Sequence, residues 1–474
     1  MRTINKISLK GVLGESLRRS CENRLKKVDY VAMALPFQQR SEGDNGWRCE
    51  FWGKVIRSAI LTNHWLKDAG LAAKIDEGID AILAAQTSDG CISSYPVEKQ
   101  LGGWDVWGRK YVLLGLLRYY DFVEKRDDIL ESACRMTDHL FGQIKESGKS
   151  ICETGWHCGL ASCSILTAVM QLYAHTGEKR FLEYARDIVA QGCNWTHDIF
   201  EAARNGFWPS EIGNGKAYEM TSCFEGLADF WRVEPDEKYA EACRKYFEGV
   251  RQREIFITGT GGLKDRNGEY WCSGALHQTQ QGRSIGMLGE TCITTTWMHY
   301  CHKMIGIANE SAIYDEAEKS IYNALLGAMM PDGSNWCHQN PTPLTNGCKQ
   351  PTTDQIMRGF GKPFHGHDCC LAQGPEGLAF APLFAFDADK DGTVAINLYE
   401  PMEAEFSDGI RLSISGDYPY SNIINIGMDS NGQSVPLRLR VPSFCKAVSL
   451  NGIEQPHDGF LQIERIWTAD DIIP

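Results

Sequence analysis

Residues 51–86, FWGKVIRSAILTNHWLKDAGLAAKIDEGIDAILAAQ, set the pattern that most of the chain follows. The two halves of this stretch, 51–69 and 71–86, each carry apolar residues at helical spacing, and Gly70 interrupts the periodicity between them. The stretch therefore predicts a hairpin of two amphipathic helices.

The same helix–loop–helix pattern recurs along the chain. The further pairs are 109–122 with 128–144, 160–175 with 180–191, 217–232 with 238–252, and 291–307 with 311–326. No strand-like run of comparable strength separates them. We therefore predict a mainly α protein whose residues 1–380 form an (α/α)6-type barrel, or toroid. In such a ring the long loops between pairs should gather at one end. Functional residues usually lie on loops of this kind, over a rigid scaffold.

The sequence changes character after Phe380. Short apolar runs, such as 394–399 and 435–441, alternate with turns rich in Gly, Asn, Asp and Pro. This pattern predicts a β-sandwich module over residues 381–474. Residues 470–474 fall inside another strand-like run, so we expect the chain to be cut from a longer protein.

Composition excludes several classes of partner. The 474 residues carry a formal charge of −13 without a cluster of Lys and Arg, which argues against nucleic-acid binding. No apolar run is long enough for a signal-peptide core or a membrane span. The 18 cysteines lie scattered, mostly within helical patterns, as free buried thiols do. We therefore expect a cytoplasmic protein in a reducing compartment.

Two short motifs indicate chemistry. Residues 289–292 read Gly-Glu-Thr-Cys, and residues 364–370 read Phe-His-Gly-His-Asp-Cys-Cys. Adjacent cysteines rarely form a disulfide with each other, because disulfide geometry is narrow. Together the two motifs offer four donors of the types that zinc accepts. The candidate metal ligands are Glu290, Cys292, Cys369 and Cys370.

Each of these residues also has a structural interpretation when taken singly. Cys292 could be a core thiol, Glu290 a helix-capping acid, and the paired cysteines two small buried residues. His365 and His367 could be ligands instead, since imidazole also suits zinc. We interpret His365 as a substrate contact. The combination of the motifs is what favours a metal site.

The pairing of Gly-Glu-Thr-Cys with Cys-Cys resembles the catalytic core of the β-L-arabinofuranosidases of glycoside hydrolase family 127. Further segments resemble the same family, and the resemblance covers most of residues 45–470. These segments are 84–90, 172–177, 314–324 and 340–341.

The resemblance implies an α/α barrel followed by β-sandwich domains, with zinc held by the four candidate ligands and Cys369 as the nucleophile. It implies a retaining glycoside hydrolase that acts on a β-L-arabinofuranoside-like or another unusual sugar in plant-type glycans. A thiolate is suited to attack an anomeric carbon, in the role that a carboxylate has in ordinary retaining enzymes.

The sequence departs from the family pattern at the general acid/base. The family's glutamate would fall at Gly274, which cannot transfer a proton. Positions that align with the family's substrate-contacting histidines carry Ser162 and Lys216. The candidate substitutes for the acid/base are Glu219, Glu269 and His277. The candidate substrate contacts are Trp104, Trp107, His157, Trp271 and His365.

We therefore predict a zinc-dependent glycoside hydrolase with a carbohydrate substrate and without a nucleic-acid or membrane partner; a homodimer is a candidate assembly. Two alternatives remain open at this point. One is a sugar isomerase or epimerase on an α/α toroid, which would work without a metal. The other is a non-catalytic glycan-binding protein with structural zinc.

Overall fold

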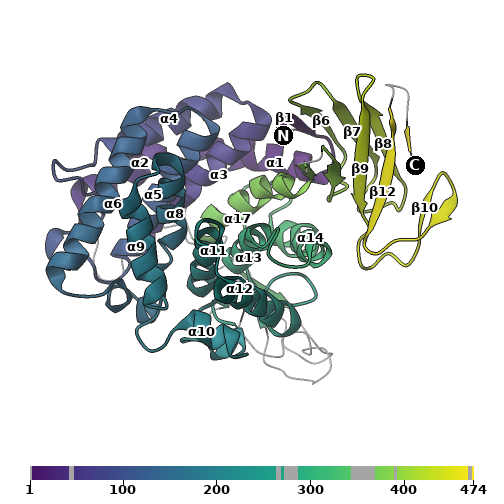
Figure 1. Ribbon diagram of the computed structural model, residues 1–474. Helices are drawn as coiled ribbons and strands as arrows, with labels where there is room; N and C mark the ends of the chain where they lie inside the picture. Colours follow the sequence, from purple (N-terminus) through teal and green to yellow (C-terminus); the bar gives the residue numbers. More distant parts are fainter. Residues whose placement is uncertain are drawn as a thin grey trace.

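The computed structural model describes residues 3–41, 47–262, 268–271, 287–342, 369–388, 392–467 and 472–473. A barrel of helices is followed by a module of β-sheets, which lies beside one end of the helical array (Figure 1). This arrangement confirms the predicted fold class.

Six inner helices form a closed ring in the described part of the chain. Each packs against the next, and the last packs against the first. In chain order they are α3 (Phe51–Leu66), α5 (Asp105–Phe122), α8 (Leu166–Thr176), α11 (Ala217–Val233), α13 (Thr291–Lys303) and α17 (Cys369–Phe380).

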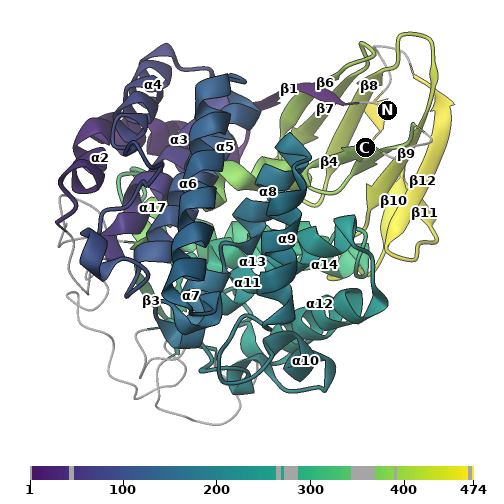
Figure 2. The ribbon, with the colours of Figure 1, turned by 60° about the vertical axis from the view of Figure 1, so that its left-hand side comes forward.

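An outer layer of helices covers the ring, and each outer helix packs on its inner neighbour (Figure 2). The outer helices are α1 (Val12–Asn23), α4 (Ala69–Leu83), α6 (Asp127–Ser147), α9 (Lys179–Ala190), α12 (Glu237–Gly249) and α14 (Glu310–Lys319). Shorter helices complete the array: α2 (Tyr30–Gln39), α7 (Leu160–Cys163), α10 (Ile199–Arg204) and α15 (Leu326–Ala328).

The sequences of the two layers explain their positions. Helix α5 buries 14 of its 18 residues, so it is enclosed on nearly all sides. Helix α9 buries 5 of 12, in a stripe at helical spacing that faces inward. Backbones approach closely between α3 and α5, where a Cβ atom on Gly53 would lie 2.1 Å from the carbonyl oxygen of Tyr111.

One inner segment, His157–Thr176, is the stretch among the described residues that is long and apolar enough to cross a membrane by length and composition. The sequence analysis missed it. Its helical path is interrupted at Cys158, whose φ is 58°, and 72% of its apolar window is buried inside the protein. The segment supplies α7 and α8 of the barrel.

The C-terminal module contains a five-stranded and a four-stranded sheet in the described residues, with strand orders β1-β6-β7-β8-β13 and β12-β9-β5-β4. Burial alternates along β6, as expected where one face is packed. The strands are β4 (Phe386–Ala388), β5 (Val394–Ile396), β6 (Met402–Phe406), β7 (Arg411–Gly416), β8 (Ile424–Asp429), β9 (Ser434–Arg440), β10 (Val448–Leu450), β11 (Ile453–Gln455), β12 (Phe460–Ile466) and β13 (Ile472–Ile473).

The N-terminal strand β1 (Ile4–Leu9) pairs antiparallel with β6. The sequence analysis assigned these residues to the barrel, and this detail was wrong, because the strand adds an edge to the C-terminal sheet. The domain boundary at residue 380 stays a prediction. A buried ion-pair group also links the two parts, since Arg440 of β9 contacts Asp315 (2.6 Å) and Glu318 of α14.

Glu400 joins the sheet module to the first helix. Its Oε1 atom accepts hydrogen bonds from the backbone N–H groups of Leu13 (2.8 Å) and Gly14 (3.4 Å) in α1. Its Oε2 atom accepts one from the Tyr322 hydroxyl (3.1 Å). Burial raises the pKa of Glu400 to about 7, although the bonds from the α1 backbone oppose this rise.

We expect Glu400→Gln to become more stable relative to the wild type as pH rises. An acid with a raised pKa in the folded state contributes stability below its unfolded pKa, and this contribution is lost as pH rises through about 7. The difference in the free energy of unfolding should change by roughly 3 kcal/mol between pH 4 and 8. Denaturant unfolding at several pH values measures it.

The control for this experiment is Glu403→Gln, which changes an exposed glutamate on the same segment. The pH-dependent change in stability should be clearly larger for Glu400→Gln than for Glu403→Gln, because Glu400 is buried and Glu403 is exposed. A stability difference of Glu400→Gln that stays constant with pH would contradict the assignment of the raised pKa.

Candidate metal centre and active site

The two sequence motifs meet at the N-terminal ends of two neighbouring inner helices. Glu290 ends β2 (Met287–Glu290) in an extended conformation (φ −96°, ψ 129°), and Cys292 lies in the first turn of α13. Cys369 and Cys370 are the first residues of α17. Because Glu290 precedes the helix, its side chain and that of Cys292 can converge, which they could not do within a regular helix.

The four predicted ligands lie together. The Sγ atom of Cys370 is 3.4 Å from that of Cys292, 4.0 Å from that of Cys369, and 3.8 Å from Oε1 of Glu290. Ligand atoms of Glu290, His338, Cys369 and Cys370 all lie within 4.8 Å of one another. This buried cluster could hold a metal ion.

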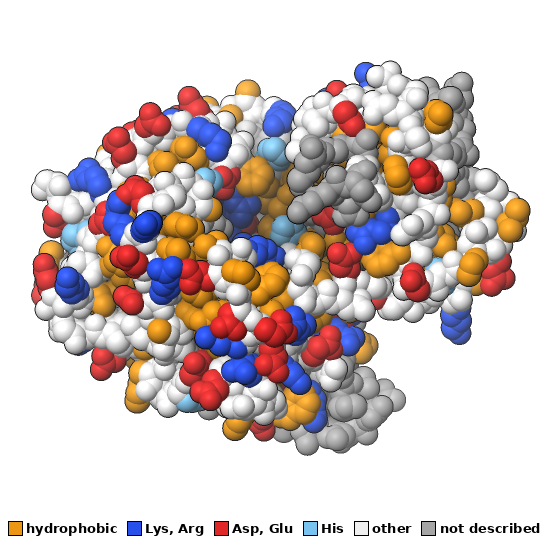
Figure 3. All heavy atoms as spheres, viewed as in Figure 1, with side chains coloured by type: hydrophobic (Ala, Val, Ile, Leu, Met, Phe, Trp, Pro, Cys, Tyr) orange, Lys and Arg blue, Asp and Glu red, His pale blue; other side chains and the backbone are white. Residues whose placement is uncertain are grey.

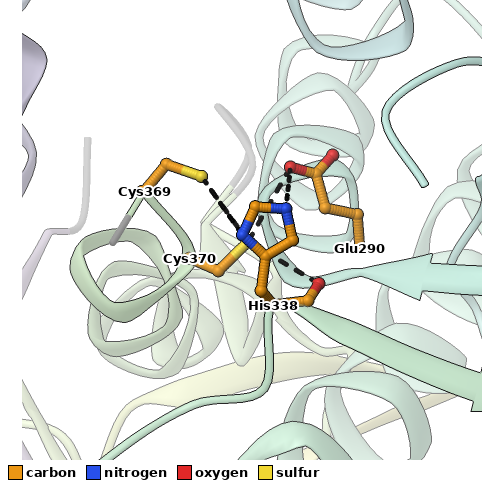
Figure 4. Close-up of side chains that lie close together, drawn as sticks. All are labelled: Glu290, His338, Cys369 and Cys370. Atoms are coloured by element: carbon orange, nitrogen blue, oxygen red, sulfur yellow. Dashed lines mark hydrogen bonds and ion pairs between the residues drawn. The ribbon is translucent and has the colours of Figure 1, made fainter. Parts of the chain in front are cut away.

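His338 is the member of the cluster that the sequence analysis missed. It directly precedes β3 (Gln339–Thr342), whose antiparallel pairing with β2 brings it beside Glu290. Its Nδ1 atom lies 3.7 Å from Sγ of Cys369, and its Nε2 atom lies 3.9 Å from Oε1 of Glu290. Figure 4 shows the imidazole ring between these two side chains. The available signal was its position two residues before the family-like Asn340.

The donor set fits a metal such as zinc. Cys292 and Cys370 are fully buried, and Glu290 is 3% exposed. The Oε2 atom of Glu290 is buried and has no hydrogen-bond partner among the described residues. An unsatisfied buried carboxylate oxygen is costly, and a cation would compensate for it. Three thiols and a carboxylate are ligands that zinc accepts in a four-coordinate site.

The three thiols differ in acidity. Burial raises the pKa of Cys292 and of Cys370 well above the usual range. Cys369 behaves in the opposite way, because hydrogen bonds from the Cys292 and Cys370 thiols hold its pKa well below the usual value. Burial and the nearby charges of Glu269 and Cys369 raise the pKa of Glu290. Cys369 is therefore the thiol that ionises most easily, and it is only partly buried.

A buried lysine, Lys54, lies beside the thiol cluster. The ammonium group of Lys54 lies 3.0 Å from Glu50 and 4.0 Å from Sγ of Cys292. Burial alone would lower its pKa, but the charges of Cys292 and Glu50 outweigh burial and raise it. Burial raises the pKa of Glu50 to about 7.

Two of the predicted substrate contacts belong to the packed interior. Trp107 is 1% exposed, and its indole N–H donates a hydrogen bond to Glu50, the ion-pair partner of Lys54. Trp271 is 3% exposed, and its indole N–H donates to the Tyr246 hydroxyl (2.9 Å). Among the described residues both indoles are packed and hydrogen-bonded, and a sugar contact by either of them stays a prediction.

The other two described candidates for substrate contact, Trp104 and His157, are only partly buried. The rings of Trp104 and His157 pack at 5.3 Å, and the Tyr270 ring lies 6.2 Å from His157. His157 has a φ of 59°, a strained conformation of the kind that clusters at functional sites. Burial lowers the pKa of His157.

The carboxylates of Glu219 and Glu269 approach the same lysine. Lys216 forms an ion pair with Glu269 and lies 3.8 Å from Glu219. Oε1 of Glu269 also lies 4.0 Å from Nε2 of His338, which connects it to the cysteine cluster. The remaining predicted residues lie outside the described part of the chain. They are His277, His365, His367 and the family acid/base position Gly274.

Comparison with known families decides the class of the protein. The model of the β-L-arabinofuranosidase GH127 catalytic domain matches residues 12–382, and that of the GH127 middle domain matches residues 393–474. The chain belongs to glycoside hydrolase family 127. This GH127 protein is therefore a glycoside hydrolase, and its substrate is a carbohydrate. No match is found among curated proteins.

Solved structures of GH127 proteins share its fold. One is Ara127N, a β-L-arabinofuranosidase from Geobacillus stearothermophilus T6, with a TM-score of 0.72 and 17% identity over 99% of this chain and 81% of that one. Another is the GH127 β-arabinofuranosidase BT3674, with a TM-score of 0.74 and 18% identity over 99% and 78% of the two chains.

We expect Cys292→Ala to lose the bound metal and His338→Ala to keep it. Glu290 and the three cysteines would by themselves complete a four-coordinate shell, and the Lys54 ammonium group favours a thiolate at Cys292. Elemental analysis after dialysis against a chelator measures the metal bound per chain. Cys301→Ala, which removes a buried thiol further along α13, is the matched control. Loss of metal in His338→Ala with retention in Cys292→Ala would contradict this ligand set.

Proposed function

We propose that the protein is a zinc-dependent retaining glycoside hydrolase in which the thiolate of Cys369 attacks the anomeric carbon. One observation carries the proposal. Glu290, Cys292 and Cys370 converge in the buried interior beside Cys369, which is the partly exposed thiol of the cluster. Family membership supports the reaction class, and the geometry supports the roles of these residues.

Glu290, Cys292, Cys369 and Cys370 would hold the zinc ion. When bound, zinc keeps its thiolate ligands deprotonated at neutral pH. The position of Cys369 at the start of α17 adds to this effect, because the partial positive charge at a helix N-terminus stabilises a thiolate.

The reaction then has two halves. In the first, Sγ of Cys369 bonds to the anomeric carbon while the bond to the leaving oxygen breaks, and that oxygen takes a proton from a general acid. In the second, a base takes a proton from water, the water oxygen attacks the same carbon, and the carbon–sulfur bond breaks. Two inversions retain the anomeric configuration and restore the thiolate.

Glu269 is our assignment for the general acid and base. It contacts His338 of the cluster, and its side chain is 30% exposed, so it can meet both a leaving group and water. Glu219 is only 2% exposed, and its carboxylate lies 3.8 Å from the Lys216 ammonium group. We assign Lys216 and Glu219 to the positioning of Glu269.

We propose that the sugar is a β-L-arabinofuranoside or another unusual sugar of plant-type glycans. The two GH127 structures described above belong to enzymes named as arabinofuranosidases. Trp104 and His157 would form a wall of the sugar site, because their rings pack together and both residues are only partly buried. Aromatic rings stack well on the apolar faces of sugars.

We expect Cys369→Ala to lower kcat by about 1000-fold or more, because the variant has no nucleophile. The assay is hydrolysis of a panel of nitrophenyl glycosides that includes the β-L-arabinofuranoside. Cys445→Ala, which changes a thiol in the sheet module, is the control. Mass spectrometry of quenched wild-type enzyme should show one sugar attached to the peptide that contains Cys369.

Activity of Cys369→Ala within tenfold of the wild type, or a sugar attached to another residue, would contradict the role of Cys369. Stoichiometric metal without turnover of any glycoside would contradict a hydrolase and favour glycan binding with structural zinc.

We expect Glu269→Gln to slow the hydrolysis of alkyl glycosides by about 100-fold or more. The first step with dinitrophenyl glycosides should be nearly unaffected, because that leaving group needs no proton. Stopped-flow measurement of the dinitrophenol burst reports this step. Glu219→Gln is the comparison, and because Glu219 acts through Glu269 it should show the same dependence on the leaving group in weaker form. Equal losses on both classes in Glu269→Gln would show that another group is the acid.

A further inference from the structure

A cavity inside the helical ring is lined by residues other than those of the cysteine cluster. The cluster lies where α13 and α17 begin, whereas this cavity extends to the last turns of these two helices, at Lys303 and Phe380. Its wall also includes Arg57 of α3 and Lys110 of α5, which lie in the first halves of their helices. Its volume is about 180 Å³, well above the roughly 15 Å³ that one water needs. Figure 3 shows a hollow in the middle of this face, with Lys, Arg and His side chains on its walls.

The cavity wall contains buried hydrogen-bond donors that lack acceptors. Lys110 is 1% exposed and Arg57 is 6% exposed. Neither Nζ of Lys110 nor Nε of Arg57 has a hydrogen-bond partner among the described residues. The Lys110 ammonium group instead lies over the rings of Trp107 (4.3 Å) and Tyr111 (5.1 Å). A ligand that accepts hydrogen bonds would satisfy both donors.

The charges at the inner end of the cavity leave a positive excess. Arg57 and Arg118 share one carboxylate oxygen of Glu376, at 3.0 and 3.2 Å. Lys110 adds a third cation, and Glu225 is the second acid. Burial lowers the pKa of Lys110 to about 7 and raises that of Glu225 to about 7. Three cations therefore face two acids, which a ligand with one negative charge would balance.

The other charges that line the cavity are already paired. Lys303 contacts Asp229 at 2.7 Å, and Asp121 contacts His175 at 3.0 Å. The apolar part of the wall includes the rings of Phe122 and Phe380. Lys110 and Arg57 are thus the lysine and arginine of the described wall that keep a donor without an acceptor, and apolar surface is available for the rest of a small molecule.

We propose that this cavity binds a small organic anion through a single carboxylate group, which contacts Lys110 and Arg57. A carboxylate matches both the charge excess and the N–H geometry of a guanidinium group. Phosphate fits less well, because at neutral pH about half of it is the dianion, whose second negative charge would remain unbalanced.

No residue of the cysteine cluster is among the described residues that line this cavity. The rings of Tyr111 and Tyr218, which line the cavity, both pack against Trp107. Lys54 lies over the Tyr218 ring (4.5 Å) and contacts Cys292 of the cluster. Lys110 lies over the Trp107 ring and lines the cavity. The proposal therefore does not depend on the proposed reaction.

Calorimetric titration of the full chain at neutral pH and constant ionic strength tests the proposal, with acetate, galacturonate and inorganic phosphate as probes. We expect saturable binding of at least one carboxylate, and weaker binding of phosphate. Lys110→Met should lower the carboxylate affinity by about tenfold or more. Lys303→Met, which removes a cation already paired with Asp229, and Cys369→Ala in the reaction site should both bind within about threefold of the wild type.

Glu225→Gln provides a test of opposite sign that does not depend on the folding of Lys110→Met. It removes the acid that competes for Lys110, so it should raise the carboxylate affinity by about threefold or more. The absence of saturable binding by the wild type would overturn the proposal and leave a cavity that holds water only. Equal affinities of wild type, Lys110→Met and Glu225→Gln, loss of binding in Cys369→Ala, or tighter binding of phosphate would also overturn it.

Discussion

The packing of α17 against α3 closes the inner ring, and the cysteine cluster depends on this contact. Trp65 of α3 donates a hydrogen bond to the carbonyl of Ala379 (2.7 Å), and Ser58 donates one to that of Ala372 (2.9 Å). These contacts fix both halves of the last inner helix. Its first turn then lies beside α13, so that Cys370 meets Cys292 from 78 residues earlier in the chain.

The barrel interior contains many charged groups, and their pairing determines what each of its two sites can do. Near the cluster, the Lys54 ammonium group lies between Glu50 and Cys292, and it compensates for negative charge on the thiols. In the neighbouring cavity, Glu376 neutralises only part of the charge of Arg57 and Arg118. Unpaired buried charges are costly, so the thiol cluster is suited to a cation and the cavity to an anion.

Periodicity in the sequence was sufficient to predict the helical hairpins, because each helix must bury an apolar stripe or its whole surface. The motifs around Glu290 and Cys369 likewise predicted residues that the fold brings together. His338 could not be found this way, since its position depends on the pairing of β2 with β3. The burial of Trp107 and Trp271 could not be predicted, because residue type does not reveal which way a ring faces.

X-ray absorption spectroscopy at the zinc edge of the purified wild-type protein tests the central claim most directly. The account predicts one zinc per chain with three sulfur ligands at about 2.3 Å and one oxygen ligand at about 2.0–2.2 Å. A protein without stoichiometric zinc, or with a shell of nitrogen and oxygen alone, would contradict the claim that Glu290, Cys292, Cys369 and Cys370 form a metal centre.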